Sequence, residues 1–116
     1  MATNTGADLS GKRCQPCEGG VPPMNEREVR QLLSKLPEWQ LGGDGKQIHR
    51  TWTLESFKEG IDFINRIADV AEAEQHHPDL CLTDYKQVTV KLCTHAIDGL
   101  SENDFIVAAK IDELPS

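Results

Sequence analysis

A long amphipathic helix in the middle of the chain is the feature that most limits the possible folds. Apolar residues recur at helical spacing from Thr53 or Ser56 to about Gln75. They form two adjacent stripes, one of Phe57, Ile61, Ile64, Ala68 and Ala71 and the other of Phe63, Ile67 and Val70. This apolar face is broader than a single sheet needs to cover. The part of this face that the sheet would not cover favours packing against the same helix of a second copy. Deeper burial of the helix inside a monomer is the alternative.

Strand-like segments flank this helix on both sides. Before it, residues 39–41 and 47–53 enclose a glycine-rich turn, which predicts a β-hairpin. After it, residues 80–82 and 87–95 predict a second pair of strands. The last segment alternates apolar and polar residues, which is typical of a strand with one buried face.

Two shorter helices complete the predicted order of elements. Asn25 with Glu28, and Ser101 with Asp104, have the residue types and spacing of capping boxes, and each pair precedes an apolar helical pattern. The order is therefore α-β-β-α-β-β-α. This order favours an α+β fold with a four-stranded antiparallel sheet and helices packed on one face.

Length and composition limit the class of protein. The 116 residues predict one domain over residues 25–116, preceded by a flexible N-terminal lead-in over 1–24. The 12 Lys and Arg residues against 19 Asp and Glu residues give a net charge of −7, which argues against binding to nucleic acid or to an anionic membrane. We see no membrane-spanning apolar run and no secretory signal, so we predict a cytoplasmic protein.

Three of the four histidines, His76, His77 and His95, lie in the C-terminal half of the chain. Imidazole gives or takes a proton near neutral pH without large adjustment. Each residue also has an ordinary structural explanation on its own, since a His-His-Pro sequence can simply end a helix and Asp104 can simply cap one. Glu72 can be one more charge on a solvated helix face.

A metal site is the first functional alternative. The side chains of His76 and His77 diverge because they are neighbours, and the H-E-x-x-H pattern is absent. Cys14 and Cys17 form a C-x-x-C pair without a second pair at zinc-site spacing, which leaves a disulfide or metal role as an alternative. We predict no metal and no cofactor.

The joint pattern of these residues resembles the pterin-4a-carbinolamine dehydratase family. The resemblance rests on the order Glu72-x-x-x-His76-His77-Pro78, Tyr85, Thr94-His95 and Gly99-Leu100-Ser101-x-x-Asp104, and it covers the chain from about Asn25 to Leu114. It implies the loss of water from a 4a-hydroxytetrahydropterin to give the quinonoid dihydropterin. It also implies that His76, His77 and His95 are the catalytic residues, with His76 and His95 as proton donor and acceptor in either order. Glu72, Pro78, Thr94 and Asp104 are then expected to bind or frame the substrate.

The resemblance also implies partners. It predicts a homodimer or homotetramer that assembles through the helix over residues 54–75 and the edges of the sheet. It suggests a functional link to an aromatic amino-acid hydroxylase, whose tetrahydrobiopterin-type cofactor the reaction would recycle. Animal members of the family also bind a transcription factor, so a protein-binding or regulatory module without catalysis is the alternative function.

Overall fold

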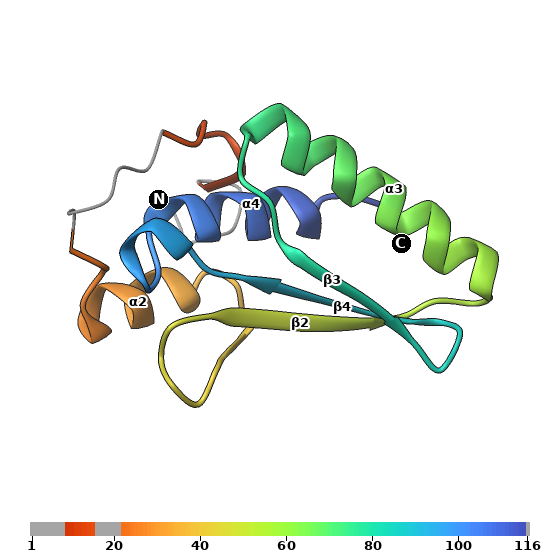
Figure 1. The fold of residues 1–116 in the computed structure, drawn as a ribbon, viewed down its shortest axis with the longest axis horizontal. Coiled ribbons are helices and arrows are strands. Elements are labelled where there is room, and N and C mark those ends of the chain that lie inside the picture. The colour runs from red at the N-terminus through yellow and green to blue at the C-terminus, as the bar shows by residue number, and fades with distance from the viewer. Residues whose placement is uncertain (1–8, 16–21, 116) are drawn as a thin grey trace, which may run out of the picture.

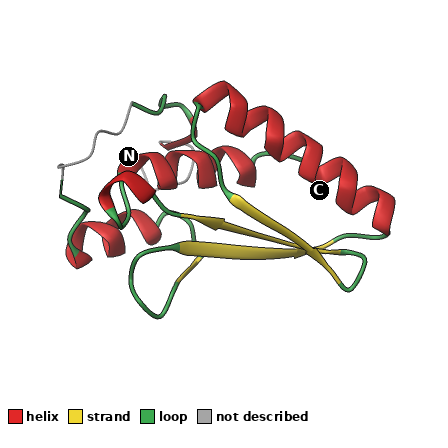
Figure 2. Cartoon of the chain, viewed as in Figure 1, coloured by secondary structure: helices red, strands yellow, loops and turns green. Residues whose placement is uncertain are grey.

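The computed structural model describes residues 9–15 and 22–115 (Figure 1). Its helices are α2 (Glu26–Leu33), α3 (Phe57–Glu74), α4 (Glu102–Asp112) and the short 3₁₀ helix η1 (His95–Ile97). Its strands are β1 (Gln40–Leu41), β2 (Ile48–Thr53), β3 (Asp79–Thr83) and β4 (Gln87–Leu92). They form one antiparallel sheet in the order β1-β2-β4-β3, and the helices pack on one face of it (Figure 2). The predicted α+β class is confirmed.

The sheet has one apolar face and one polar face because its side chains alternate. Ile48 and Trp52 of β2 point into the core, as do the three apolar residues of β4, which are Val88, Val90 and Leu92. On the other face, the hydroxyls of Thr51 and Thr89 lie 2.8 Å apart. The core is therefore on the side where the helices lie.

The long helix α3 turns its two apolar stripes in different directions. Phe63 and Ile67 of the second stripe are buried against the sheet and α4, as is Ala71 at the end of the first stripe. Phe57 and Ile61 of the first stripe are 55% and 37% exposed. Gly60 lies where α3 approaches β3 most closely, since a Cβ there would stand 3.1 Å from a methyl group of Leu82. The helix thus fills the core with one stripe and leaves much of the other at the surface.

The helix α4 is buried on nearly all sides. Every residue from Asn103 to Ala109 is buried, and so is Ile111. This burial holds the first turn of α4, including Asp104, in a fixed position behind the ends of α3 and β4.

Two boundaries position the histidines, and of these the end of α3 agrees with the sequence prediction whereas the end of β4 differs from it. The helix α3 ends at Glu74 because Gln75 adopts a left-handed conformation with φ of 54°. The strand β4 ends at Leu92 rather than continuing to His95. Beyond it the chain turns back, because the backbone N–H of Thr94 donates to the carbonyl of Gly99 at 2.8 Å.

Residues 9–15 pack against the domain that we predicted to begin at residue 25. Leu9 is 1% exposed and joins the core, and the Lys12 ammonium lies 2.7 Å from the Glu102 carboxylate. In Figure 1 this red segment runs beside the C-terminal end of α3, where the Cys14 backbone N–H donates to Glu74 at 2.8 Å. Part of the predicted lead-in therefore forms a wall of the folded unit, while residues 1–8 and 16–21 lie outside the described part.

Candidate active site

His76 and His77 follow the C-terminal end of α3 directly. The left-handed conformation of Gln75 turns the chain away from the helix axis, and the backbone N–H of His76 still donates to the carbonyl of Ala71 at 3.2 Å. The two rings then diverge toward different carboxylates. His77 Nε2 lies 2.6 Å from Glu72 Oε2 at the surface, where both side chains are more than half exposed.

The ring of His76 is held by a carboxylate from a distant part of the chain. His76 Nε2 lies 2.6 Å from Asp104 Oδ1, and the Asp104 side chain is fully buried. A carboxylate only accepts hydrogen bonds, so an ionised Asp104 requires the proton on Nε2. In a neutral ring this leaves the lone pair on Nδ1, which makes no hydrogen bond within residues 9–15 and 22–115. Asp104 therefore fixes the tautomer and the orientation of His76.

The second oxygen of Asp104 ties it to the chain that follows β4 and to the start of α4. Asp104 Oδ2 accepts hydrogen bonds from the Thr94 hydroxyl at 2.8 Å and from the Ser101 backbone N–H at 3.0 Å. The latter bond is the carboxylate half of the predicted capping box. One buried carboxylate thus connects the helix cap, the end of β4 and the His76 ring.

His95 reaches the same region from the other side. It is the first residue of η1, it is exposed, and both of its ring nitrogens lie within 3.9 Å of the Cys93 sulfur. Burial raises the pKa of the Cys93 thiol, so it stays protonated at neutral pH. Unlike His76 and His77, His95 makes no contact with a carboxylate in the described residues, which leaves its ring more free to turn.

The three histidines line one hollow of about 650 Å³. The end of α3 contributes His76 and His77, and the chain after β4 contributes Thr94 and His95. The remaining predicted site residues are not in its wall: Asp104 lies behind His76, Glu72 lies beside His77, and Pro78 is not part of the lining. Over the described ranges, no three His, Cys, Asp or Glu side chains are grouped as metal ligands.

The N-terminal segment supplies a wall of this hollow that the sequence analysis did not anticipate. Arg13, Cys14 and Gln15 line it, and Asn103 holds them by accepting from the Gln15 backbone N–H at 3.0 Å and donating to its carbonyl at 2.6 Å. Burial, assisted by the nearby Glu74, raises the pKa of Cys14 to about 12, so its thiol is neutral. Cys17, its predicted partner in the C-x-x-C pair, lies outside the described residues.

Glu74 is the anchor of that segment. Its side chain is only 6% exposed, and its carboxylate lies 3.6 Å from the Lys110 ammonium and 3.9 Å from the Arg13 guanidinium. The hydrogen bond from the Cys14 backbone, with the two cations, holds the pKa of Glu74 below its ordinary value despite burial. Glu74 looks like an ordinary surface charge in the sequence, so only the fold reveals this role.

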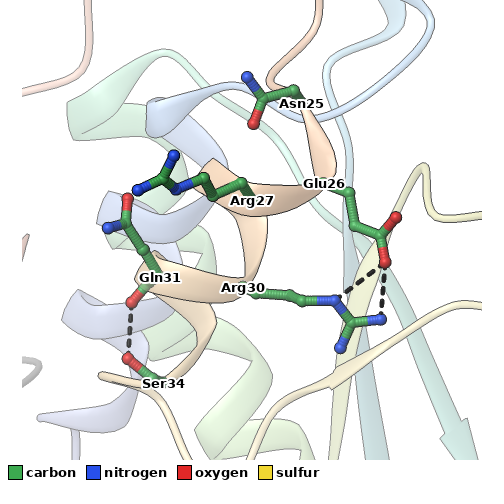
Figure 3. A pocket seen from close by; sticks show the side chains of 6 residues that line it. All are labelled: Asn25, Glu26, Arg27, Arg30, Gln31 and Ser34. Carbon is green, nitrogen blue, oxygen red and sulfur yellow. Dashed lines mark hydrogen bonds and ion pairs between the residues drawn. The ribbon is translucent and has the colours of Figure 1, made fainter.

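A larger hollow of about 830 Å³ lies against α2, away from the histidines (Figure 3). All of its lining residues are polar and belong to this one helix and its two caps. Several of these residues already bind one another. Glu26 forms an ion pair with Arg30 at 2.8 Å, and the Ser34 hydroxyl donates a hydrogen bond to the Gln31 backbone carbonyl at 2.6 Å. We therefore place the candidate active site at the histidines.

Comparison with known proteins identifies the family of the chain. The family model described as pterin 4 alpha carbinolamine dehydratase matches residues 22–114, which include all three histidines. The chain belongs to the pterin-4a-carbinolamine dehydratase family. Its relatives include a putative pterin-4-alpha-carbinolamine dehydratase of Halorhodospira halophila, which is 47% identical over 91% of this chain and 96% of that protein.

Two further relatives are a longer plant protein and a protein of known structure. The mitochondrial pterin-4-alpha-carbinolamine dehydratase 2 of Arabidopsis thaliana is 49% identical over 93% of this chain, but the matched part spans only 59% of that protein. A solved structure described as a transcriptional coactivator/pterin dehydratase from Brucella melitensis is 30% identical, with a TM-score of 0.72, and the match covers 78% of this chain and 95% of that one. Among the described helices of this chain, none is long and apolar enough to cross a membrane.

Proposed function

We propose that this chain is a hydro-lyase that removes water from a 4a-hydroxytetrahydropterin to give the quinonoid dihydropterin. The observation that carries the proposal is the convergence of His76, His77 and His95 on one hollow, with His76 held in a single tautomer by the buried Asp104. Family membership and the names of the relatives support the same reaction.

The reaction needs one proton donor and one proton acceptor. The C4a–O bond breaks as the hydroxyl takes a proton and leaves as water, while the N5–H bond breaks and its electron pair forms the C4a=N5 double bond. Both transfers are general acid–base steps, each of which contributes typically about a hundred- to ten-thousand-fold in rate.

The geometry favours His76 as the acceptor of the N5 proton. Its Nδ1 carries the lone pair, and the imidazolium formed on protonation would lie 2.6 Å from the buried Asp104 carboxylate, which stabilises a positive ring. His95, which is exposed and lies on another wall, is then the donor to the leaving hydroxyl. His77, held by Glu72, contacts the substrate ring, and Thr94 helps to shape the wall of the hollow.

A dehydratase assay on single alanine variants tests this assignment. We expect His76→Ala and His95→Ala each to lower the rate of dehydration by at least about tenfold, because each removes one proton transfer. His49→Ala is the matched control, since His49 lies on the opposite face of the sheet in β2. Full activity in both site variants would contradict the catalytic assignment.

We also propose that the chain forms a homodimer or homotetramer through α3 and the edges of the sheet. The support is the apolar stripe that α3 leaves at the surface, with Phe57 and Ile61 exposed, and the unpaired outer edge of β3. Ile61→Asp should give a smaller assembly in size-exclusion chromatography with light scattering. Arg66→Asp is the control, because Arg66 lies about 140° around the same helix from Ile61. An unchanged mass for Ile61→Asp would refute the helix interface.

The proposed biological role is to recycle the tetrahydrobiopterin-type cofactor of an aromatic amino-acid hydroxylase. The product of the proposed reaction is the oxidised pterin that a reductase must reduce before a hydroxylase can use it again. A coupled assay with a purified hydroxylase tests the link: added protein should raise the steady rate of hydroxylation. His76→Ala protein should not.

A second candidate function is a protein-binding or regulatory module. The Brucella melitensis relative is described as a transcriptional coactivator as well as a pterin dehydratase, and the exposed stripe of α3 offers a surface for a partner helix. Two variants distinguish the candidate functions. Ile61→Asp should abolish partner binding and leave the histidines untouched, whereas His95→Ala should lower dehydration and leave partner binding unchanged.

A cytoplasmic location remains a prediction from the sequence. The Arabidopsis thaliana relative carries the word mitochondrial in its name. The experiment should therefore distinguish a cytoplasmic from a mitochondrial location. Fractionation of the source cells, with an antibody against this chain, would distinguish them.

A further inference from the structure

An arginine of the N-terminal segment lies at the exposed edge of the candidate active site. Arg13 lines the hollow that holds the three histidines, and its side chain is 78% exposed. Its guanidinium lies 3.9 Å from the Glu74 carboxylate, which is too far for a hydrogen bond. Within residues 9–15 and 22–115 the Arg13 side chain makes no hydrogen bond, so its N–H donors are available to a ligand.

The fold does not need Arg13 to balance the charge of Glu74. The Lys110 ammonium lies nearer to that carboxylate, at 3.6 Å, and is only 20% exposed. The Cys14 backbone N–H donates to the same carboxylate at 2.8 Å. An exposed ion pair as long as that of Arg13 contributes little to stability. The hollow therefore explains the position of Arg13 better than the stability of the fold does.

The backbone on both sides of Arg13 is held in place. Before it, Leu9 is 1% exposed and belongs to the core. After it, the Asn103 side chain exchanges two hydrogen bonds with the Gln15 backbone, at 3.0 and 2.6 Å. A segment that is fixed before a ligand arrives presents its side chains at a lower entropic cost than a free terminus would.

The place of Arg13 in the wall suits one group of a pterin. Arg13 lies beside Glu74, two residues before His76, so both side chains belong to the same part of the wall. The proposed reaction involves C4a and N5, and the carbonyl carbon C4 is bonded directly to C4a. Its oxygen lies on the same edge of the ring as N5, so a pterin that presents N5 to His76 brings this oxygen to the side of Arg13. A guanidinium only donates hydrogen bonds, and a carbonyl oxygen only accepts them.

We propose that Arg13 is a substrate-binding residue whose guanidinium donates a hydrogen bond to the C4 carbonyl oxygen of the bound pterin. Asn103 is then a positioning residue, because it acts through the segment that carries Arg13. This inference rests on the proposed dehydratase function and adds a residue to its binding site.

Equilibrium binding measured by titration calorimetry at pH 7 tests the contact without relying on turnover. The probes are 6-methylpterin and 2,4-diamino-6-methylpteridine, in which an amino group replaces the carbonyl oxygen at C4. An amino group on this ring does not accept a hydrogen bond from a guanidinium. Arg13→Ala should bind 6-methylpterin about three- to tenfold more weakly than the wild-type protein does, as the loss of one exposed charge-assisted hydrogen bond allows. Its affinity for the diamino compound should be unchanged.

Two further variants separate the guanidinium from the segment that carries it. Lys12→Ala is the matched control, since Lys12 is the neighbouring cation but pairs with Glu102 at 2.7 Å and does not line the hollow. It should leave both affinities unchanged. Arg13→Lys keeps a positively charged donor, so it should retain part of the affinity for 6-methylpterin. Thermal unfolding of each variant shows that the fold is kept.

The dehydration assay distinguishes binding from proton transfer. Arg13 takes no proton in the proposed reaction, so Arg13→Ala should raise KM about three- to tenfold and leave kcat within about twofold of the wild-type value. Asn103→Ala should also raise KM, because it removes both bonds to Gln15. In a protein that already carries Arg13→Ala, the same change should have little further effect on KM, since no guanidinium is left to position.

The outcomes separate this proposal from the proposed function. An unchanged affinity for 6-methylpterin in Arg13→Ala, an equal loss for both probes, or an equal loss in Lys12→Ala would overturn the role of Arg13 and leave the dehydratase function intact. An equal rise in KM on Asn103→Ala with and without Arg13 would overturn the positioning role of Asn103. Failure of the wild-type protein to dehydrate the carbinolamine would overturn the proposed function, and this inference with it.

Discussion

Replacing Asp104 by asparagine tests the central feature of the site with almost no change in shape. Asp104 accepts three hydrogen bonds, from His76 Nε2, the Thr94 hydroxyl and the Ser101 backbone N–H. An asparagine amide has one oxygen and one NH₂ group. If its oxygen keeps the bonds from Thr94 and Ser101, its NH₂ group faces His76.

That NH₂ group can only donate, so His76 must then accept on Nε2 and carry its proton on Nδ1. The lone pair that we assign to proton abstraction is lost from Nδ1, although the ring stays in place. Since a general base contributes typically about a hundred- to ten-thousand-fold, we expect kcat to fall by about a hundredfold or more. The KM should change much less, because every residue that lines the hollow keeps its position.

The assay is steady-state dehydration of the carbinolamine, together with the nitrogen-15 NMR shifts of the His76 ring. Asp112→Asn is the control, because Asp112 is another carboxylate on α4, partly buried, that accepts hydrogen bonds from Trp39 and Arg50 rather than from a histidine. If Asp104→Asn retains the wild-type kcat, or if its His76 ring keeps the proton on Nε2, the tautomer argument is wrong.

Three other predictions concern stability and reactivity. Because the pKa of Glu74 is lowered in the folded protein, its carboxylate stabilises the fold above pH 4.5, its ordinary pKa, and this stabilisation is lost as the pH falls further. Glu74→Gln should therefore unfold at a lower denaturant concentration than the wild-type protein at pH 7. It should also lose less stability than the wild-type protein when the pH is lowered. Iodoacetamide at pH 8 should modify the exposed Cys81 well before Cys14, whose pKa is raised to about 12, as peptide mass mapping would show. Ile67→Ala should lower the free energy of unfolding in urea by about 2–5 kcal/mol, because Ile67 is fully buried.

The local features of the fold were predictable because they depend on neighbouring residues. The capping box at Asn25 is present as predicted, with hydrogen bonds of 2.9 and 3.1 Å between Asn25 and Glu28. The four strands and three main helices are also present in the predicted order. The end of β4 was not predictable in this way, because the turn that places His95 in η1 is closed by a bond between Thr94 and Gly99.

The site was predictable only in part, for a related reason. The motif identified the three histidines and Asp104, but no local pattern shows that Asp104 reaches His76 across 28 residues. The wall formed by residues 9–15 was missed because polar contacts hold most of it, including one between Cys14 and Glu74 that spans 60 residues.

The position of Asp104 explains why the first turn of α4 serves both the fold and the site. One oxygen accepts from the backbone at the start of the helix and from Thr94, while the other holds His76. Since the rest of α4 is buried, the carboxylate has little freedom to move, and the His76 ring shares this rigidity. A proton acceptor built in this way is oriented before the substrate arrives, so the protein does not have to reorganise this group during the reaction. His95 has no carboxylate partner in the described part of the chain. Of the two proposed proton-transfer residues, His76 and His95, it is therefore His95 whose ring the bound pterin has to orient.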